Sequence, residues 1–147
     1  MTARSHPFSS FSASHWLTPA ALGGIAWNVF GVVQFVGSVT ATEASLIASG
    51  LTPDQASVMT GYPTWMTVAF AVGVFAGLAG STLLLLRSTV AKPVLLASLV
   101  AYVALWIGDA LHGVFGAFGA SQVIILTIVV AIAAALFAFS RHPAAKV

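Results

Sequence analysis

An aspartate and a histidine lie three positions apart in the segment WIGDALHGVF, residues 106–115. On a helix, four aromatic and polar residues fall on one stripe at spacings of four, three and three: Tyr102, Trp106, Asp109 and His112. An ionisable side chain in an apolar segment is a functional candidate, and an imidazole can change its charge near neutral pH. The stripe is therefore predicted to face protein and not lipid.

Two interpretations of this pair stay open. In the first, Asp109 and His112 line an outward-facing, ligand-binding pocket with three residues from other segments: Gln34, Tyr62 and Trp65. In the second, the pair is a hydrogen-bonded clip between helix ends, and Tyr62 and Trp65 are interfacial aromatic anchors. At ~1.5 Å per residue from Pro93, Asp109 lies about 24 Å along its helix, near the edge of a ~30 Å hydrocarbon core. That position argues against a deep proton relay.

The sequence lacks the residue sets of common metal and catalytic sites. Asp109 and His112 supply only two ligands, and three histidines are predicted on the opposite side of the membrane: His6, His15 and His142. Without cysteines there are no disulfides or thiolate sites. No nucleophile motif, phosphate loop, or haem or flavin motif is found, so we expect no metal, no cofactor and no enzyme activity.

The composition identifies the solvent around these residues. Of 147 residues, 59% are hydrophobic and 5% are charged, whereas a water-soluble domain has about 25% charged residues. The chain is therefore predicted to be an all-α integral membrane protein whose partner is the lipid bilayer. Five Lys and Arg against three Asp and Glu are too few charges for a nucleic-acid surface, so no nucleic-acid partner is expected.

Four apolar segments approach the ~20 residues that a membrane-spanning helix needs. Within one membrane domain of residues 17–140, the predicted spans are about residues 19–39, 63–86, 94–114 and 122–139. Thr18 is expected to cap the first span, with Pro19 at its first helical position. This stretch exceeds the ~7–15 residues of a signal-peptide core, which favours a retained helix over cleavage after SVTA.

The basic residues indicate the orientation of the chain. All five lie on one predicted side of the membrane: Arg4, Arg87, Lys92, Arg141 and Lys146. Since basic residues accumulate in cytoplasmic loops, the tails of residues 1–16 and 141–147 are predicted to be cytoplasmic, with the 40–61 connection outside.

The 40–61 connection is the largest polar segment. Two pairs match the capping-box spacing and are each expected to start a short helix: Thr40 with Glu43, and Thr52 with Gln55. Gly50 and Gly61 are placed to end these helices. The predicted fold is thus a four-helix transmembrane bundle with two short surface helices in its first external loop.

Small and polar residues predict how the spans pack, because they allow close approach and find partners in lipid. The second span carries a stripe of small residues: Ala69, Gly73, Gly77, Gly80 and Ser81. One face of the first span carries Gly24, Asn28, Gly31 and Ser38, with Gln34 at its edge. We expect these faces to pack together, or one of them on another copy. Asn28 must then be hydrogen-bonded across an interface, as a structural clamp or as a ligand contact.

Two stretches carry a resemblance to a known group. AWNVFGVVQF and LTPDQASVMTGYPTWMTVAFAVGVFAGLAGSTLLLLR are similar to small bacterial four-span proteins often labelled "sugar transporter", over about residues 20–140. The most specific marks are Trp27-Asn28 with Gly31, Pro63-x-Trp65 before Ala69-Phe70, the glycine stripe, and the leucine run ending at Arg87. A looser resemblance is to DoxX-like membrane proteins, which implies association with a redox system. The main resemblance implies four-span topology and, for a bacterial chain, the inner (cytoplasmic) membrane.

Two function classes follow from these observations. A small-solute or lipid-facing carrier would work as a homo-oligomer, because four short helices enclose little volume, and it predicts an accessible pocket containing Asp109, His112 and Gln34. A non-catalytic accessory or structural subunit of a larger membrane complex predicts instead that these polar groups bond to one another.

Overall fold

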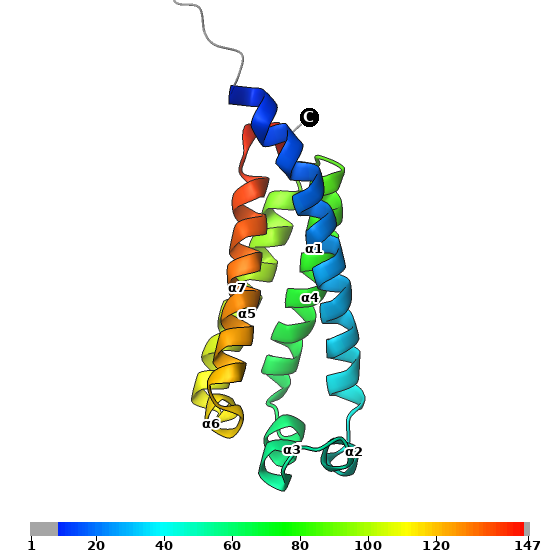
Figure 1. The fold of residues 1–147 in the computed structure, drawn as a ribbon, viewed down its shortest axis with the longest axis vertical. Helices are drawn as coiled ribbons and strands as arrows, with labels where there is room; N and C mark the ends of the chain where they lie inside the picture. The colour runs from blue at the N-terminus through cyan, green and yellow to red at the C-terminus, as the bar shows by residue number, and fades with distance from the viewer. Residues whose placement is uncertain (1–8, 146–147) are drawn as a thin grey trace, which may run out of the picture.

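Four long helices form a bundle in the computed structural model, which describes residues 9–145 (Figure 1). They are α1 (Ser9–Thr40), α4 (Thr64–Leu85), α5 (Ala91–Leu111) and α7 (Ala120–Ser140). Each is long and apolar enough to cross a membrane, α1 over residues His15–Thr40. Among residues 9–145 there is no strand. The predicted all-α membrane bundle is confirmed, and the chain is a multi-pass membrane protein by helix length and composition.

The short helices gather at one end of the bundle, which we call the loop-helix end (Figure 1). They are α2 (Glu43–Ala48), α3 (Pro53–Thr60) and α6 (Val114–Phe118). The start of α1 and the end of α7 lie at the other end, here called the terminal end, with the 3-10 helix η1 (Pro143–Ala145). His15 and His142 lie at this terminal end, opposite His112, whereas the predictions for Arg4, His6 and Lys146 lie outside the described residues.

The first helix begins earlier than predicted. α1 starts at Ser9 and holds Pro19 in its interior, so the prediction that Thr18 caps a helix beginning at Pro19 is wrong. A proline inside a helix removes one backbone hydrogen bond. Packing compensates for that loss, because Leu17 and Ala21 on either side of Pro19 are buried against Leu84 and Ala145.

The first capping box also lies at a different position from the prediction. Thr40 does not start α2, because its hydroxyl donates to Val36 O at 2.8 Å and Thr40 is the last residue of α1. Thr42 is the cap: its Oγ1 accepts from Ser45 N at 3.2 Å, while Ser45 Oγ accepts from Thr42 N at 3.0 Å. Gly50 follows α2 in the left-handed region at φ 108°.

The second capping box is confirmed. Thr52 Oγ1 accepts from Gln55 N at 3.2 Å, and Gln55 Oε1 accepts from Thr52 N at 3.1 Å. The other end of the Gln55 amide donates to Ala117 O at 3.1 Å, which ties α3 to α6. Gly61 caps the C-terminal end of α3.

The third span ends earlier than predicted. α5 stops at Leu111, with His112 as its C-cap, because Gly113 adopts the left-handed conformation at φ 77°. Val114 begins the additional helix α6, which the sequence did not predict, and Gly119 at φ 74° separates α6 from α7. This short helical connection turns the chain back so that the first turn of α7 lies beside the last turn of α5.

α4 is the central helix and packs extensively on α1 and α5. Its contact with α1 is close because a Cβ atom at Gly77 would overlap the Asn28 side chain, and one at Gly24 would lie 2.6 Å from Ser81 Oγ. A Cβ at Gly31 would lie 3.0 Å from Val74 of α4. The small residues of both helices therefore meet at the α1–α4 interface.

The same stripe of small residues on α4 also packs against α5. A Cβ atom at Gly73 would lie 2.7 Å from the Tyr102 ring, and one at Gly80 would lie 2.6 Å from the Leu95 side chain. Ala69 packs against the central apolar cluster to which Tyr102 belongs. The glycines of α4 thus admit bulky side chains of α5 that would otherwise hold the two backbones apart.

Candidate functional site

Asp109 is the centre of the candidate site at the loop-helix end. It lies in the last turn of α5 and is 1% exposed. The Tyr62 hydroxyl, just before α4, donates to Asp109 Oδ1 at 2.9 Å, and Gln122 Nε2, in the first turn of α7, donates to Oδ2 at 3.3 Å. We call Tyr62, Asp109 and Gln122 the Asp109 clasp, because they join the end of α5 and the start of α7 to the segment that leads into α4.

Burying a carboxylate is costly unless its oxygens are hydrogen-bonded. In the clasp each oxygen has one donor from another element, and a hydrogen bond to a charged group contributes about 1.5–3 kcal/mol. Burial, and then the neighbouring Asp109 carboxylate, raise the pKa of the Tyr62 phenol above its usual range. Tyr62 therefore keeps its proton near neutral pH and acts as the donor.

His112 does not bond to Asp109, so the hydrogen bond that the clip interpretation required is absent. Its Nδ1 lies 3.0 Å from Gly108 O, one turn back on the same helix. Carbonyl groups in the last turn of a helix lack backbone partners, so a histidine at the C-cap finds an acceptor there. The His112 side chain is exposed, and its ring meets Trp65 edge-on with 5.9 Å between centroids.

The other predicted residues of the pocket are not part of the clasp. Trp106 Nε1 donates to Thr127 Oγ1 of α7 at 3.1 Å, and the Trp106 ring packs edge-on against Phe115. Trp65 is 45% exposed and lies over Gly108, where a Cβ would be 2.7 Å from its ring. Gln34 is exposed on α1 and forms no hydrogen bond with Asp109 or His112.

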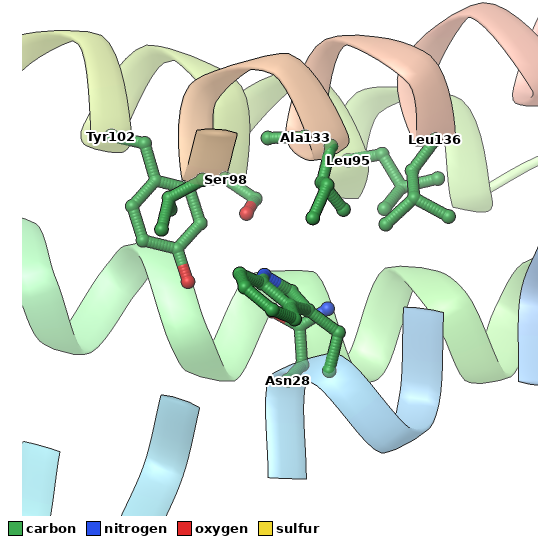
Figure 2. A pocket seen from close by; sticks show the side chains of 9 residues that line it. Asn28, Leu95, Ser98, Tyr102, Ala133 and Leu136 are labelled. Carbon is green, nitrogen blue, oxygen red and sulfur yellow. The ribbon is translucent and has the colours of Figure 1, made fainter. Parts of the chain in front are cut away.

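Asn28 and Tyr102 belong to a second polar group halfway along the bundle. Figure 2 shows Asn28 of α1 directed toward the space where Ser98 and Tyr102 of α5 face Ala133 and Leu136 of α7. Ser98 Oγ donates to Gly73 O of α4 at 2.7 Å. Asn28 Nδ2 donates to Gly24 O at 2.7 Å within its own helix, so the predicted hydrogen bond across an interface is absent from this amide.

Two buried oxygens in this second group have no hydrogen-bond partner. They are Asn28 Oδ1 and Ser81 Oγ, in residues 2% and 0% exposed. An orphaned buried acceptor typically costs about 1–3 kcal/mol. The structure thus contains one polar group with its hydrogen bonds made and one with its hydrogen bonds incomplete.

Gln122, Ser98 and Thr127 are site residues that sequence reasoning missed. Each was visible as a polar residue inside an apolar segment, the signal that identified Asn28. What the spacing could not supply was the partner, because Tyr62 and Asp109 are 47 residues apart and Trp106 and Thr127 are 21 apart.

No group of three or more His, Asp or Glu side chains that could hold a metal ion occurs in the part of the chain that the structure describes. In the comparisons with known proteins, no family model, curated protein or solved structure matches the chain. The functional interpretation therefore depends on the geometry of the Asp109 clasp and of the central polar group.

Proposed function

We propose that the protein is a non-catalytic accessory or structural subunit of a larger membrane complex. The observation that supports this best is the closed state of the Asp109 clasp: the carboxylate is bonded within the chain, as this class predicts, but to Tyr62 and Gln122 in place of His112 and Gln34. Asp109 is 1% exposed, and both its oxygens accept hydrogen bonds from the same chain. A carrier using this carboxylate to bind a solute would need it to face water or the solute, whereas a subunit needs it only to hold helix ends together.

A small-solute carrier acting as a homo-oligomer is the second candidate, and one feature favours it. A cleft of about 240 Å³ lies between the end of α1, α3 and the start of α4. Polar residues on its wall are Ser38, Thr60, Tyr62 and Thr67. A solute in this cleft would contact Tyr62, but the Tyr62 hydroxyl is already engaged by Asp109. We therefore rank this function below the accessory subunit.

We infer that the protein resides in the bacterial inner membrane with both termini in the cytoplasm. Three described basic residues lie toward the terminal end: Arg87, Lys92 and Arg141. The acidic residues Glu43 and Asp54 lie in α2 and α3 at the loop-helix end. This distribution supports cytoplasmic placement of the terminal end by the positive-inside rule.

The mass of the assembly extracted from native membranes in mild detergent tests the proposed function. An accessory subunit is expected to migrate in a particle whose mass is not a whole multiple of the 15.0 kDa chain. Reconstituted alone into liposomes, it should release no trapped sugar. Particles containing only copies of this chain, together with sugar release above that of empty liposomes, would contradict the proposal and support the carrier.

A further inference from the structure

The cleft between the end of α1, α3 and the start of α4 has a wall of mixed character. Its hydroxyl groups belong to Ser38, Thr60, Tyr62 and Thr67, and its apolar side chains belong to Val39, Ala41 and Met59. Its volume of about 240 Å³ equals that of about eight water molecules at ~30 Å³ each. Val39 and Thr60 are exposed, so a small molecule can enter from outside without any movement of a helix.

The hydroxyl protons of this wall are already used within the chain. Ser38 Oγ donates to the carbonyl three residues back at 2.8 Å, and Thr60 Oγ1 donates to the carbonyl four residues back at 3.0 Å. The Tyr62 hydroxyl donates to Asp109 at 2.9 Å. Because a hydroxyl carries one proton and two lone pairs, a ligand that reaches these three side chains finds only acceptors. The cleft therefore favours a ligand that donates hydrogen bonds.

The charge distribution around the cleft favours a positive ligand. The last turn of α1 contributes Ser38 and Val39 to the wall, and the last turn of α3 contributes Met59 and Thr60. The C-terminal end of a helix carries partial negative charge, because its last carbonyl groups lack backbone partners. All three acidic residues of the chain also lie at the loop-helix end, and no residue of the wall is basic.

A small primary ammonium ion matches these features. Its compact head combines a positive charge with three N–H donors. A short carbon chain attached to it has Val39 and Met59 to pack against. A carboxylate or phosphate would meet acceptor oxygens and negative helix ends, and a neutral sugar would supply donors without the charge. A sodium ion would leave most of the volume and the apolar part of the wall unfilled.

We propose that this cleft binds a primary ammonium group on a short carbon chain, carried by a free amine or by the head group of an ethanolamine lipid. Its N–H groups donate to the oxygens of Ser38, Thr60 and Tyr62. Tyr62 continues to donate its own proton to Asp109, so the Asp109 clasp stays closed while the ligand is bound. The inference goes beyond the accessory-subunit function and does not depend on it.

Methionine methyl groups give a direct readout of this site. Met59 lines the cleft, whereas Met66 is 0% exposed in the central apolar cluster and serves as the internal control. The full chain, with isotope-labelled methionine methyl groups, is titrated by NMR in nanodiscs of phosphatidylcholine, a lipid whose quaternary ammonium has no N–H donor. The probes are butylammonium, butyltrimethylammonium, which keeps the charge without donors, and butanol, which keeps a donor without the charge.

Butylammonium is expected to shift the Met59 signal saturably and to leave Met66 unchanged. The other two probes should bind about tenfold more weakly or less, because each lacks the charged donors. Sodium chloride at the same ionic strength should not shift Met59. Equal affinity for all three probes, an unshifted Met59, or equal shifts of both methionines would overturn the proposal.

Nanodiscs that also contain phosphatidylethanolamine distinguish the two sources of the ammonium group. If the lipid head group occupies the cleft, the Met59 signal is shifted before any probe is added, and butylammonium binds more weakly because it must compete. If the source is a free amine, the titration is the same in both kinds of nanodisc. Either result supports the ammonium site and assigns its source.

Variants of two threonines test the oxygens of the wall. Thr60→Val removes one acceptor and is expected to weaken butylammonium binding about threefold or more. Thr82→Val is the matched control: Thr82 also donates to the carbonyl four residues back, at 2.9 Å, but lies on α4 away from the cleft, and its variant should bind as wild type does.

A double variant, Ser38→Ala with Thr60→Val, removes two acceptors and should weaken binding about tenfold or more. A Met66 signal at its wild-type position confirms that each variant is folded. Wild-type affinity in the folded double variant would contradict the site. If the double variant does not fold, the comparison of butylammonium with butyltrimethylammonium on the wild-type chain still decides, because it needs no substitution.

Discussion

Replacing Tyr62 by phenylalanine removes one hydroxyl from the Asp109 clasp and keeps the rest of the ring. In the native structure this hydroxyl donates to Asp109 Oδ1 at 2.9 Å, while Gln122 donates to Oδ2 at the longer distance of 3.3 Å. Because Asp109 is 1% exposed, water does not readily replace the lost donor. A hydrogen bond to a buried charged group is worth about 1.5–3 kcal/mol, and we expect Tyr62→Phe to lower the free energy of unfolding by about that amount.

A second hydrogen bond of the same chain supplies the control. Trp106 Nε1 donates to Thr127 Oγ1 at 3.1 Å, and both partners are neutral. Hydrogen bonds between membrane helices contribute on average about 0.6 kcal/mol. Thr127→Val removes the acceptor with little change in shape, so it is expected to cost less than half as much as Tyr62→Phe.

The assay is reversible unfolding of the purified chain in mixed micelles, with helix content followed as the fraction of dodecyl sulfate rises. Unfolding free energies are compared at one micelle composition. If Tyr62→Phe costs less than about 0.5 kcal/mol, or no more than Thr127→Val, the Asp109 clasp does not stabilise the bundle as its geometry implies.

Three further outcomes are expected. The raised pKa of Tyr62 means that its contribution to stability is present below about pH 10, the pKa of an exposed tyrosine, and is lost as pH rises above it, so unfolding scans from pH 8 to 11 should show an alkaline loss that Tyr62→Phe reduces. Gly77→Ala should lower the unfolding free energy by about 1–3 kcal/mol because its methyl group overlaps Asn28, whereas Gly37→Ala, with nothing within 4 Å, should be neutral or slightly stabilising; equal effects would mean that the α1–α4 contact is looser than described. A phosphatase that is active only outside the cytoplasm should work when inserted near Gly50 and fail at the C-terminus, and the reverse pattern would overturn the orientation.

Local signals in the sequence predicted the elements that depend on neighbours in the chain. Apolar length predicted the four spans, and the spacing of Thr52 and Gln55 predicted the start of α3. Pro19 was misleading, because the packing of Leu17 and Ala21 against the terminal end lets the helix continue through it. The start of α2 was predicted at Thr40, but a threonine hydroxyl can bond back to its own helix as well as cap a new one, and Thr40 does the former.

The candidate site was predicted only in part, because its bonds join residues far apart in the chain. Helix periodicity placed Asp109 and His112 near each other, and that spacing left two interpretations open, a mutual hydrogen bond or a shared outward-facing pocket. Each side chain has other hydrogen-bond partners: Asp109 accepts from Tyr62 and Gln122, while His112 bonds to the Gly108 carbonyl. Only the tertiary arrangement at the loop-helix end brings these donors together.

The most direct test of the closed Asp109 clasp is carboxyl labelling of the native protein in liposomes. The chain has three acidic residues, of which Glu43 and Asp54 are exposed on the short helices and Asp109 is buried. A water-soluble carbodiimide with glycinamide, followed by peptide mapping, should modify the two exposed residues and leave Asp109 unmodified. Modification of Asp109 at a rate similar to that of Glu43 and Asp54 would show that it lines an open pocket, which contradicts the accessory-subunit proposal.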